Sequence, residues 1–221
     1  MSAVARVKNV SAAFVSLLFL FVLSILAVSA PSASAAPFED DRAVTPVRGT
    51  VTKLKPTAWI ERAGRRFDLK DGSNINDFDI VRTGDGATAT LKFIDGTIIE
   101  LAPDSELAIL DIVHTPRASR FSVYITMGAA MITTGGIGLK NEAGVSITTP
   151  KGVVQANDAV VWVGVSAGEE IVRIEDMTRG PKVTVYNSAT SNLLVTTSSR
   201  YGIITDEANN MYAVELAGRD R

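Results

Sequence analysis

Hydrophobic and polar residues alternate along much of the chain. The pattern is clearest in two segments, Ala87 to Phe93 and Arg120 to Met127. A period of two places successive side chains on opposite faces of a β-sheet. In the second segment, four apolar residues share one face: Phe121, Val123, Ile125 and Met127. Both segments are therefore predicted to be β-strands.

Further short segments rich in β-branched residues follow along the chain. They are Val145 to Thr149, Val160 to Val165, Ile171 to Ile174, Val183 to Tyr186, Leu193 to Thr197, Ile203 to Thr205 and Tyr212 to Leu216. Turn-forming sequences separate the predicted strands: Ala63-Gly64, Asp71-Gly72, Gly84-Asp85-Gly86, Asp95-Gly96, Gly135-Gly136, Lys151-Gly152 and Arg179-Gly180-Pro181. Short strands that recur every 8 to 12 residues or so are typical of a sandwich, barrel or solenoid. No helical periodicity is sustained beyond the N-terminal segment, so the fold is predicted to be all-β, solenoid-like or sandwich-like.

The register of one hairpin can be predicted from its loop. A two-residue Asp95-Gly96 loop would place Leu91 opposite Glu100 and mix apolar and charged groups on one face. A three-residue loop, with Gly96 at positive φ, keeps that face largely apolar. We therefore expect the second register, which pairs Phe93 with Thr97, Leu91 with Ile99 and Ala89 with Leu101.

The N-terminus has the layout of a secretory signal peptide. Residues 1–9 contain Arg6 and Lys8 and no acid, and an apolar run extends from Val10 to Val28. An A-x-A site at Ala33-Ser34-Ala35 follows, so we expect cleavage after Ala35. The alternative is an uncleaved membrane anchor, because the run approaches the roughly 20 residues that span a bilayer. In either case, the rest of the chain is predicted to be exported to the periplasm or secreted.

Composition excludes several classes of site. The 221 residues include no cysteine and one histidine, His114, which rules out disulfides, cysteine-ligated metals and cysteine nucleophiles. The net charge of −2 gives no electrostatic reason to expect nucleic acid binding. Removal of residues 1–35 leaves 20 of the 22 basic residues against 24 acidic residues, a net charge of −4.

One segment of the predicted β region resembles a known family. Asp79 to Leu107 is similar to the core signature of the FecR family, D-x-V-x-T-G-x-G-A-x-x-x-L-x-F-x-D-G-S/T-x-I-x-L-x-P-x-S-x-L. A looser similarity extends from Gly49 to Val165 and includes a "T-P-x-G" element at Thr149 to Gly152. The family often has an "R-G-T" element soon afterwards, where this chain has Ala156-Asn157-Asp158, so any contact made through that element is in doubt.

The resemblance implies an exported, non-enzymatic binding module of the type found in iron-dicitrate signal transducers. In those transducers, a cytoplasmic segment engages a sigma factor and the periplasmic part meets a receptor. This chain has no room for a cytoplasmic segment before its apolar run, so we expect only the contact role of the exported part to carry over. The expected organisation is a signal peptide at 1–35, a linker at 36–48, a FecR-like β domain at 49–165 and further strands at 166–221 that continue or cap it.

The signature residues are expected to have structural roles. Glycines supply positive φ, Asp95 can bind backbone amides in its turn, and Pro103 can end a strand. The residues interpreted in this way are Thr83, Gly84, Gly86, Asp95, Gly96 and Pro103. Turn chemistry of this kind defines an architecture and says little about a ligand.

Two short motifs suggest specific chemistry. Gly164 to Gly168 fits the G-x-S-x-G nucleophile pattern, but no histidine follows it and the sequence indicates a hairpin loop. Asp71, Asp77 and Asp79 lie in an oxygen-rich segment that departs from the EF-hand pattern. A calcium site of another geometry stays open as an alternative to a solvated turn.

Single residues with possible binding roles are interpreted in the same way. His114 is expected to lie exposed in a loop, and a solvated basic cluster is expected at Arg62, Arg65 and Arg66. Trp59 and Trp162 are expected to be half-buried strand residues rather than a platform for sugar stacking.

The sequence thus predicts an exported FecR-like module that contacts an envelope protein of unknown identity. We expect no catalytic, cofactor-binding or metal-binding residues, no cofactor, and contact with the membrane only through an uncleaved leader. The alternative function is a structural or carbohydrate-binding component of the cell envelope.

Overall fold

The computed structural model describes residues 46–141, 144–176, 182–196 and 201–216. The expected signal peptide at 1–35 with its cleavage site, most of the expected linker and the turn at Arg179-Gly180-Pro181 lie outside these residues. The described residues all belong to one structural unit, Val44–Arg221. Its first strand begins at Val47, two residues before the expected start of the β domain.

The described residues form an all-β fold, as predicted. The strands are β1 (Val47–Lys55), β2 (Ala58–Arg62), β3 (Arg65–Asp68), β4 (Asn74–Asn76), β5 (Ile80–Thr83), β6 (Thr88–Phe93), β7 (Ile98–Leu101), β8 (Glu106–His114), β9 (Ser119–Thr133), β10 (Val145–Thr148), β11 (Gly152–Asn157), β12 (Val160–Val165), β13 (Glu170–Asp176), β14 (Lys182–Asn187), β15 (Leu193–Thr196), β16 (Tyr201–Thr205) and β17 (Met211–Glu215). One short helix, α2 (Gly136–Lys140), was not predicted, because five residues are too few to show a helical period.

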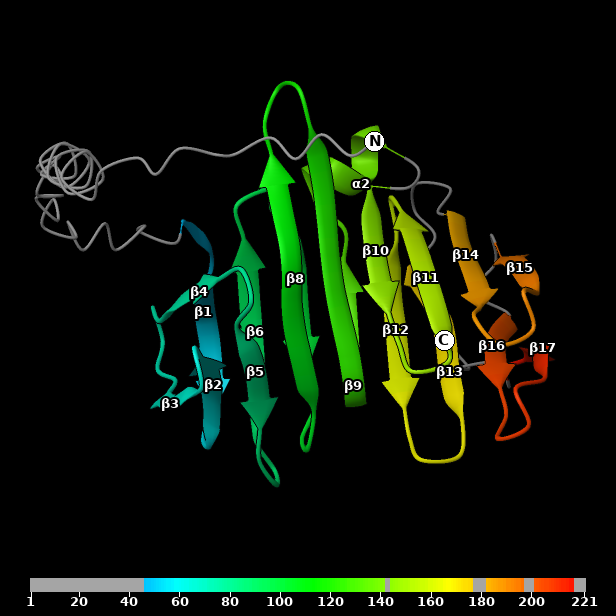
Figure 1. Cartoon of the computed structure of the whole chain (residues 1–221), viewed down its shortest axis with the longest axis horizontal. Coiled ribbons are helices and arrows are strands. Elements are labelled where there is room, and N and C mark those ends of the chain that lie inside the picture. Colours follow the sequence, from blue (N-terminus) through cyan, green and yellow to red (C-terminus); the bar gives the residue numbers. More distant parts are fainter. Residues whose placement is uncertain (1–45, 142–143, 177–181, 197–200, 217–221) are drawn as a thin grey trace, which may run out of the picture. The chain divides into compact units, whose positions relative to one another are not determined.

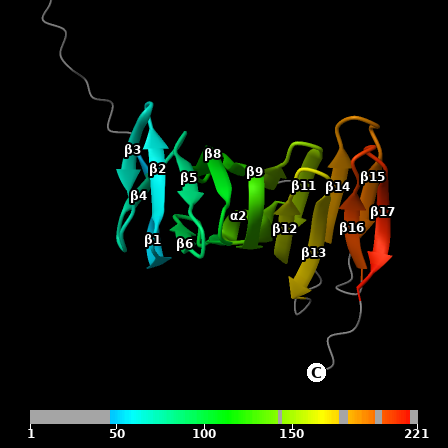
Figure 2. The ribbon, with the colours of Figure 1, turned by 90° about the horizontal axis from the view of Figure 1, so that it is seen from below.

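The strands pair into two sheets that share β9. The first sheet runs β4-β1-β6-β7-β9-β12-β13-β16-β17, and the second runs β3-β2-β5-β8-β9-β10-β11-β14-β15. Neighbouring strands are antiparallel except β9 and β10, which are parallel. Figures 1 and 2 show the strands following one another from β1–β4 at one end of this unit to β15–β17 at the other. The prediction of a solenoid-like or sandwich-like fold is confirmed.

The hydrophobic core lies between the two sheets. Alternate residues of most strands are buried, which is why the period of two in the sequence predicts them well. Phe93 of the first sheet meets Phe121 of the second edge to face, with ring centroids 5.0 Å apart. This geometry is one that aromatic pairs prefer.

The predicted register of the β6–β7 hairpin is confirmed. Leu91 pairs with Ile99 and Ala89 with Leu101, and the Phe93 N–H donates to the Thr97 carbonyl oxygen at 2.9 Å. Gly96 has φ of +87°, as the three-residue loop requires.

The prediction that Met127 shares a face with Phe121, Val123 and Ile125 is wrong. Gly128 has φ of +84°, and at this residue β9 passes from the second sheet to the first. Before this crossing, the pairing with β8 shifts, because Ile125 pairs with Leu107 but Met127 pairs with Glu106. This shift leaves Met127 51% exposed, and Ala130 and Ile132 are buried instead. A side chain at position 128 would begin 2.2 Å from Ser105 Oγ, so only glycine fits this crossing.

Candidate functional site

Two hydroxyl residues of the signature fasten strands together inside the fold. Thr83 Oγ1 donates to the Ala102 carbonyl oxygen at 2.7 Å and accepts the Ser105 N–H at 3.0 Å. Ser105 Oγ in turn accepts the Ala129 N–H at 2.9 Å, directly after the Gly128 crossing. Both side chains are buried. Their hydrogen-bonding capacity is used within the protein, which supports a structural role.

The buried carboxylate of Asp95 joins the β6–β7 hairpin to α2. Asp95 Oδ2 accepts the Thr97 hydroxyl at 2.7 Å, and Asp95 Oδ1 accepts the Thr97 N–H at 3.0 Å. Asp95 Oδ2 also lies 3.4 Å from the Ile137 N–H in the first turn of α2. Each of these donors is neutral, and the two on Thr97 lie within the turn itself, as expected for a residue that organises a turn.

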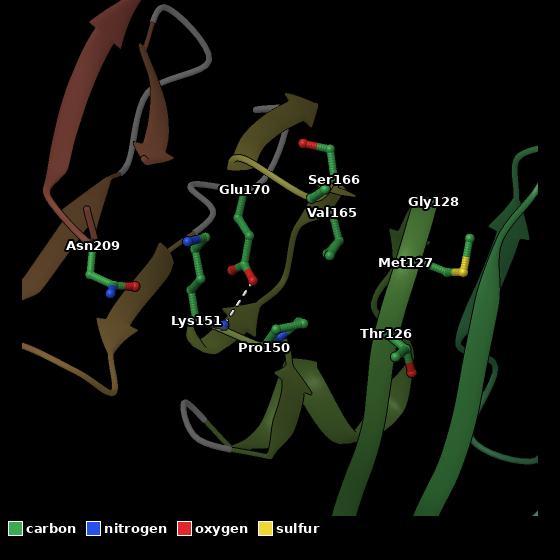
Figure 3. Close-up of a pocket in the computed structure, with 10 residues that line it drawn as sticks. Thr126, Met127, Gly128, Pro150, Lys151, Val165, Ser166, Glu170 and Asn209 are labelled. Carbon is green, nitrogen blue, oxygen red and sulfur yellow. Dashed lines mark hydrogen bonds between the residues drawn. The ribbon is translucent and has the colours of Figure 1, made fainter. Parts of the chain in front are cut away.

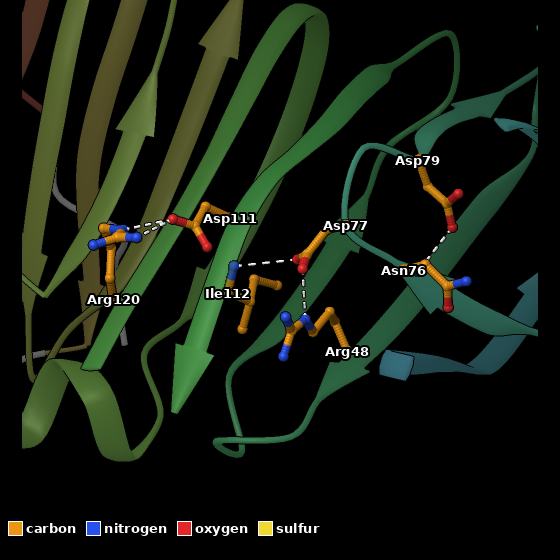
Figure 4. Close-up of polar contacts among 7 residues, drawn as sticks. All are labelled: Arg48, Asn76, Asp77, Asp79, Asp111, Ile112 and Arg120. Carbon is orange, nitrogen blue, oxygen red and sulfur yellow. Dashed lines mark hydrogen bonds and ion pairs between the residues drawn. The ribbon is translucent and has the colours of Figure 1, made fainter. Parts of the chain in front are cut away.

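Residues 76–79, from the last residue of β4 to the residue before β5, are held by two arginines, Arg48 and Arg62. Figure 4 shows the contact of Arg48 with Asp77. Asp79 is fully buried and receives two hydrogen bonds from Arg62, both 2.7 Å long, and the Asn76 N–H at 2.8 Å. This hydrogen bond with Asp79 is the largest cause that raises the pKa of Arg62. Asp77 receives Arg48 Nε at 2.7 Å and the Ile112 N–H at 3.2 Å. We call residues 76–79 the 76–79 loop.

These contacts give no support to a calcium site at Asp71, Asp77 and Asp79. The carboxylates of Asp77 and Asp79 are each neutralised by their own arginine, and Asp71 is exposed. Within the described ranges, no three acidic or histidine side chains are grouped closely enough to hold a metal ion.

The expected basic cluster at Arg62, Arg65 and Arg66 is also incorrect. Arg62 turns inward to Asp79, whereas the Arg66 guanidinium lies 4.1 Å above the centre of the Trp59 ring. The cluster was predicted because the three arginines are close in sequence. In the structure, they lie on two strands, β2 and β3, and Arg62 and Arg66 contact different partners.

A pocket of about 560 Å³ lies where β9 crosses between the sheets (Figure 3). Its walls come from β9, the turn before β11, the β12–β13 hairpin and the β16–β17 turn: Thr126, Met127, Gly128, Pro150, Lys151, Val165, Ser166, Ala167, Glu170 and Asn209. The T-P-x-G element noticed in the sequence therefore forms one side of the pocket.

Glu170 is the buried carboxylate of this pocket. Glu170 Oε2 accepts the Thr149 hydroxyl at 2.6 Å, and Glu170 Oε1 accepts the Lys151 N–H at 2.8 Å. Burial raises the pKa of Glu170, and these two hydrogen bonds only partly oppose that effect. Lys151 directs its ammonium group to the Asp206 carbonyl oxygen at 3.0 Å. Glu170 thus holds the Thr149–Gly152 turn, and no cation of the described residues is in direct contact with its carboxylate.

Sequence reasoning missed Glu170 because the predicted strand began at Ile171, one residue later. The available signal was alternation: Glu170, Val172 and Ile174 share one face of β13, and all three are buried. An acid on the inward face of a strand indicates a buried polar contact.

The G-x-S-x-G segment forms a hairpin loop, as predicted. Val165 pairs with Glu170, and Ser166 Oγ lies 3.0 Å from the Glu169 carbonyl oxygen and 3.2 Å from its nitrogen. His114, the single histidine of the chain, is exposed at the end of β8. Ser166 is therefore part of a turn that lacks the strand-to-helix elbow of a hydrolase.

Both tryptophans are half-buried on strands, as expected. The Arg173 guanidinium lies 4.3 Å from the centre of the Trp162 ring, and Arg66 lies over Trp59 in the same way. Surface hollows of about 400 and 180 Å³ adjoin Trp162. A guanidinium already covers one face of each indole, which disfavours sugar stacking on that face.

The departure from the family pattern at Ala156-Asn157-Asp158 has a structural role in this chain. Asn157 Nδ2 donates to the Gly138 carbonyl oxygen of α2 at 2.5 Å, and Ala156 is buried in the core. This segment therefore fixes α2 against the end of β11.

Comparison with known proteins shows what the central part of the chain resembles. Two crystal structures of a proposed anti-sigma factor from Parabacteroides distasonis are similar, each with a TM-score of 0.48, at 15% and 16% sequence identity. Each match covers 62% of this chain and 59% of the solved chain. No curated protein matches the sequence. Residues 79–176 match the family described as FecR protein. The central part of the chain is therefore similar to FecR proteins.

Proposed function

We propose that this chain is an exported, non-enzymatic FecR-type module that acts in envelope signalling or sensing by binding another protein. The family match over residues 79–176 supports a regulatory role. The signal-peptide pattern at residues 1–35 supports export to the periplasm or the cell exterior, with cleavage after Ala35. If the leader stays in place, it anchors the module to the membrane.

The observation that carries this proposal is the way the signature residues use their polar groups. Thr83, Asp95 and Ser105 are buried and bonded to neighbouring strands or turns. Acyl-transfer chemistry needs a nucleophile, a base and a group that orients the base. Ser166 has neither a base nor an orienting group among its hydrogen-bond partners. Because these signature residues are used inside the fold, we assign binding to the outer surface of the protein.

Localisation is tested separately from binding. Among the described residues, no helix has the length and apolar character needed to span a bilayer. Expression of the full chain in a Gram-negative host, followed by fractionation and N-terminal sequencing, should give a periplasmic or secreted form that begins at Ala36. Recovery of the full-length chain from the cytoplasm would contradict the export proposal.

The alternative is a structural or carbohydrate-binding component of the envelope, and one experiment separates the two functions. The full chain is cross-linked in living cells and purified, and the chain is also sedimented with peptidoglycan and envelope polysaccharide. Recovery of one specific envelope protein supports the signalling proposal. Cosedimentation with glycan and no protein partner would replace it with the alternative.

A further inference from the structure

Phe78, in the 76–79 loop, combines two properties that rarely occur together. Its side chain is 79% exposed, more than any other large apolar side chain in the described ranges. Its φ is +66°, a left-handed conformation that bulky residues adopt rarely and at a cost in free energy. Residues kept in such conformations are often found at functional sites.

The loop holds Phe78 outward through contacts on both sides. The Phe78 N–H donates to the Ile109 carbonyl oxygen at 2.8 Å, and the Ile109 N–H donates to the Asp79 carbonyl oxygen at 2.9 Å. The flanking carboxylates of Asp77 and Asp79 are fixed by the arginine contacts already described. Turning the Phe78 ring toward the core would therefore disrupt these backbone hydrogen bonds and the part-buried ion pairs beside them.

Two further exposed apolar side chains are carried by segments joined to this loop through Arg48. Val47 is 42% exposed and Ile94 is 48% exposed. The Ile94 N–H donates to the Arg48 carbonyl oxygen at 2.9 Å, and Val47 is the register partner of Asn76. The Arg48 side chain reaches Asp77 (Figure 4). Phe78 is thus accompanied by apolar side chains on neighbouring, hydrogen-bonded segments.

We propose that the 76–79 loop is the contact site for a partner protein whose surface has an apolar pocket that receives the Phe78 ring. This inference rests on the proposed function and adds its location. Aromatic side chains that enter a partner's pocket carry much of the binding energy in protein interfaces. A loop already fixed in its bound shape loses little conformational entropy on binding. A protruding ring on a rigid loop fits a concave partner, and the partner contacts Val47 and Ile94 around it.

The test uses photo-cross-linking of the full chain in cells of the source organism. The photoreactive residue p-benzoylphenylalanine replaces Phe78, Ile94 or, as a control, Phe67, which lies on β3 and is 47% exposed. The version with the probe at position 94 is also made with Phe78→Gly. Glycine suits positive φ, so this variant should fold at least as well as the parent, which thermal unfolding checks.

The expected result is one discrete adduct with another protein from positions 78 and 94 and none from position 67. Phe78→Gly should reduce the adduct at position 94 by about tenfold or more. An adduct from position 67 but not from 78 would overturn this site and leave the proposed function standing. Adducts only with another copy of the chain, or within it, would overturn the partner. Absence of adducts at all three positions would overturn the site. The proposed function would still stand if the general cross-linking experiment described above captures an envelope protein.

Discussion

The 76–79 loop and the turn held by Glu170 both depend on a buried carboxylate, but they compensate its charge differently. Asp79 is 0% exposed and receives a two-pronged hydrogen bond from Arg62. Glu170 is 5% exposed and, from the described residues, receives a hydroxyl and a backbone N–H but no cation. The two carboxyl groups are similarly buried but differ in their partners: Asp79 forms an ion pair, whereas burial raises the pKa of Glu170. The first arrangement gives a rigid loop, and the second a turn whose stability depends on pH.

Removal of the cation should have the largest effect. Arg62→Ala leaves the Asp79 carboxylate buried without its ion partner, which should lower the free energy of unfolding by about 3 kcal/mol or more. Urea unfolding measures the loss. Arg65→Ala, at an exposed position of the same hairpin, is the control and should change stability by less than about 0.5 kcal/mol. Equal losses for the two variants would contradict the assigned ion pair.

On the Glu170 side, Gly128 in the wall of the pocket is under a steric constraint. Gly128→Ala places a methyl group 2.2 Å from Ser105 Oγ at φ of +84°, and should cost about 2–3 kcal/mol. Gly64→Ala is a matched control, because Gly64 has φ of +71° with no atom within 4 Å of the added methyl group. It should cost about 1 kcal/mol. Chemical denaturation of both variants separates the clash from the backbone strain, and an equal cost would exclude the clash.

The raised pKa of Glu170 predicts a pH dependence of definite sign. Below the ordinary glutamate pKa of 4.5, Glu170 is protonated in both the folded and the unfolded chain. As pH rises from there toward the higher pKa of the folded state, only the unfolded chain loses this proton, so the free energy of unfolding falls. The loss is complete once pH exceeds the folded-state pKa.

Glu170→Gln should remove this contribution. A glutamine keeps an oxygen that can accept the Lys151 N–H, so the variant should differ from the parent by no more than about 1 kcal/mol at neutral pH. The measurement is the difference in unfolding free energy between the parent and the variant across the acidic range. A parent that gains stability relative to the variant as pH rises would contradict the assignment.

Phe78→Gly should have the smallest effect on stability and the opposite sign. Glycine removes the penalty for φ of +66°, and Phe78 has little buried area to lose. The variant should be equally stable or up to about 1 kcal/mol more stable than the parent, as measured by thermal unfolding. A marked loss of stability would show that the ring packs against the fold, and would weaken the distinction between the two regions.

The sequence predicts what depends on local pattern. Alternation and the Asp95-Gly96 loop gave the strands and the register of β6 and β7, because strand faces and tight turns are set by neighbouring residues. Met127 was misplaced because the register of β9 against β8 shifts between Ile125 and Met127. The partners of the aspartates could not be predicted, because Arg48 and Asp77 are 29 positions apart and only the sheet brings them together. For the same reason, the sequence offered no sign that Phe78 is held outward.

The most direct test of the central claim is the affinity of the partner identified by cross-linking. Isothermal titration calorimetry compares the parent with Phe78→Gly and with Phe67→Ala, a change at an exposed phenylalanine outside the loop. The account predicts that Phe78→Gly weakens binding by about tenfold or more, whereas Phe67→Ala leaves the affinity within about twofold of the parent. Binding of Phe78→Gly at the parent's affinity would contradict it.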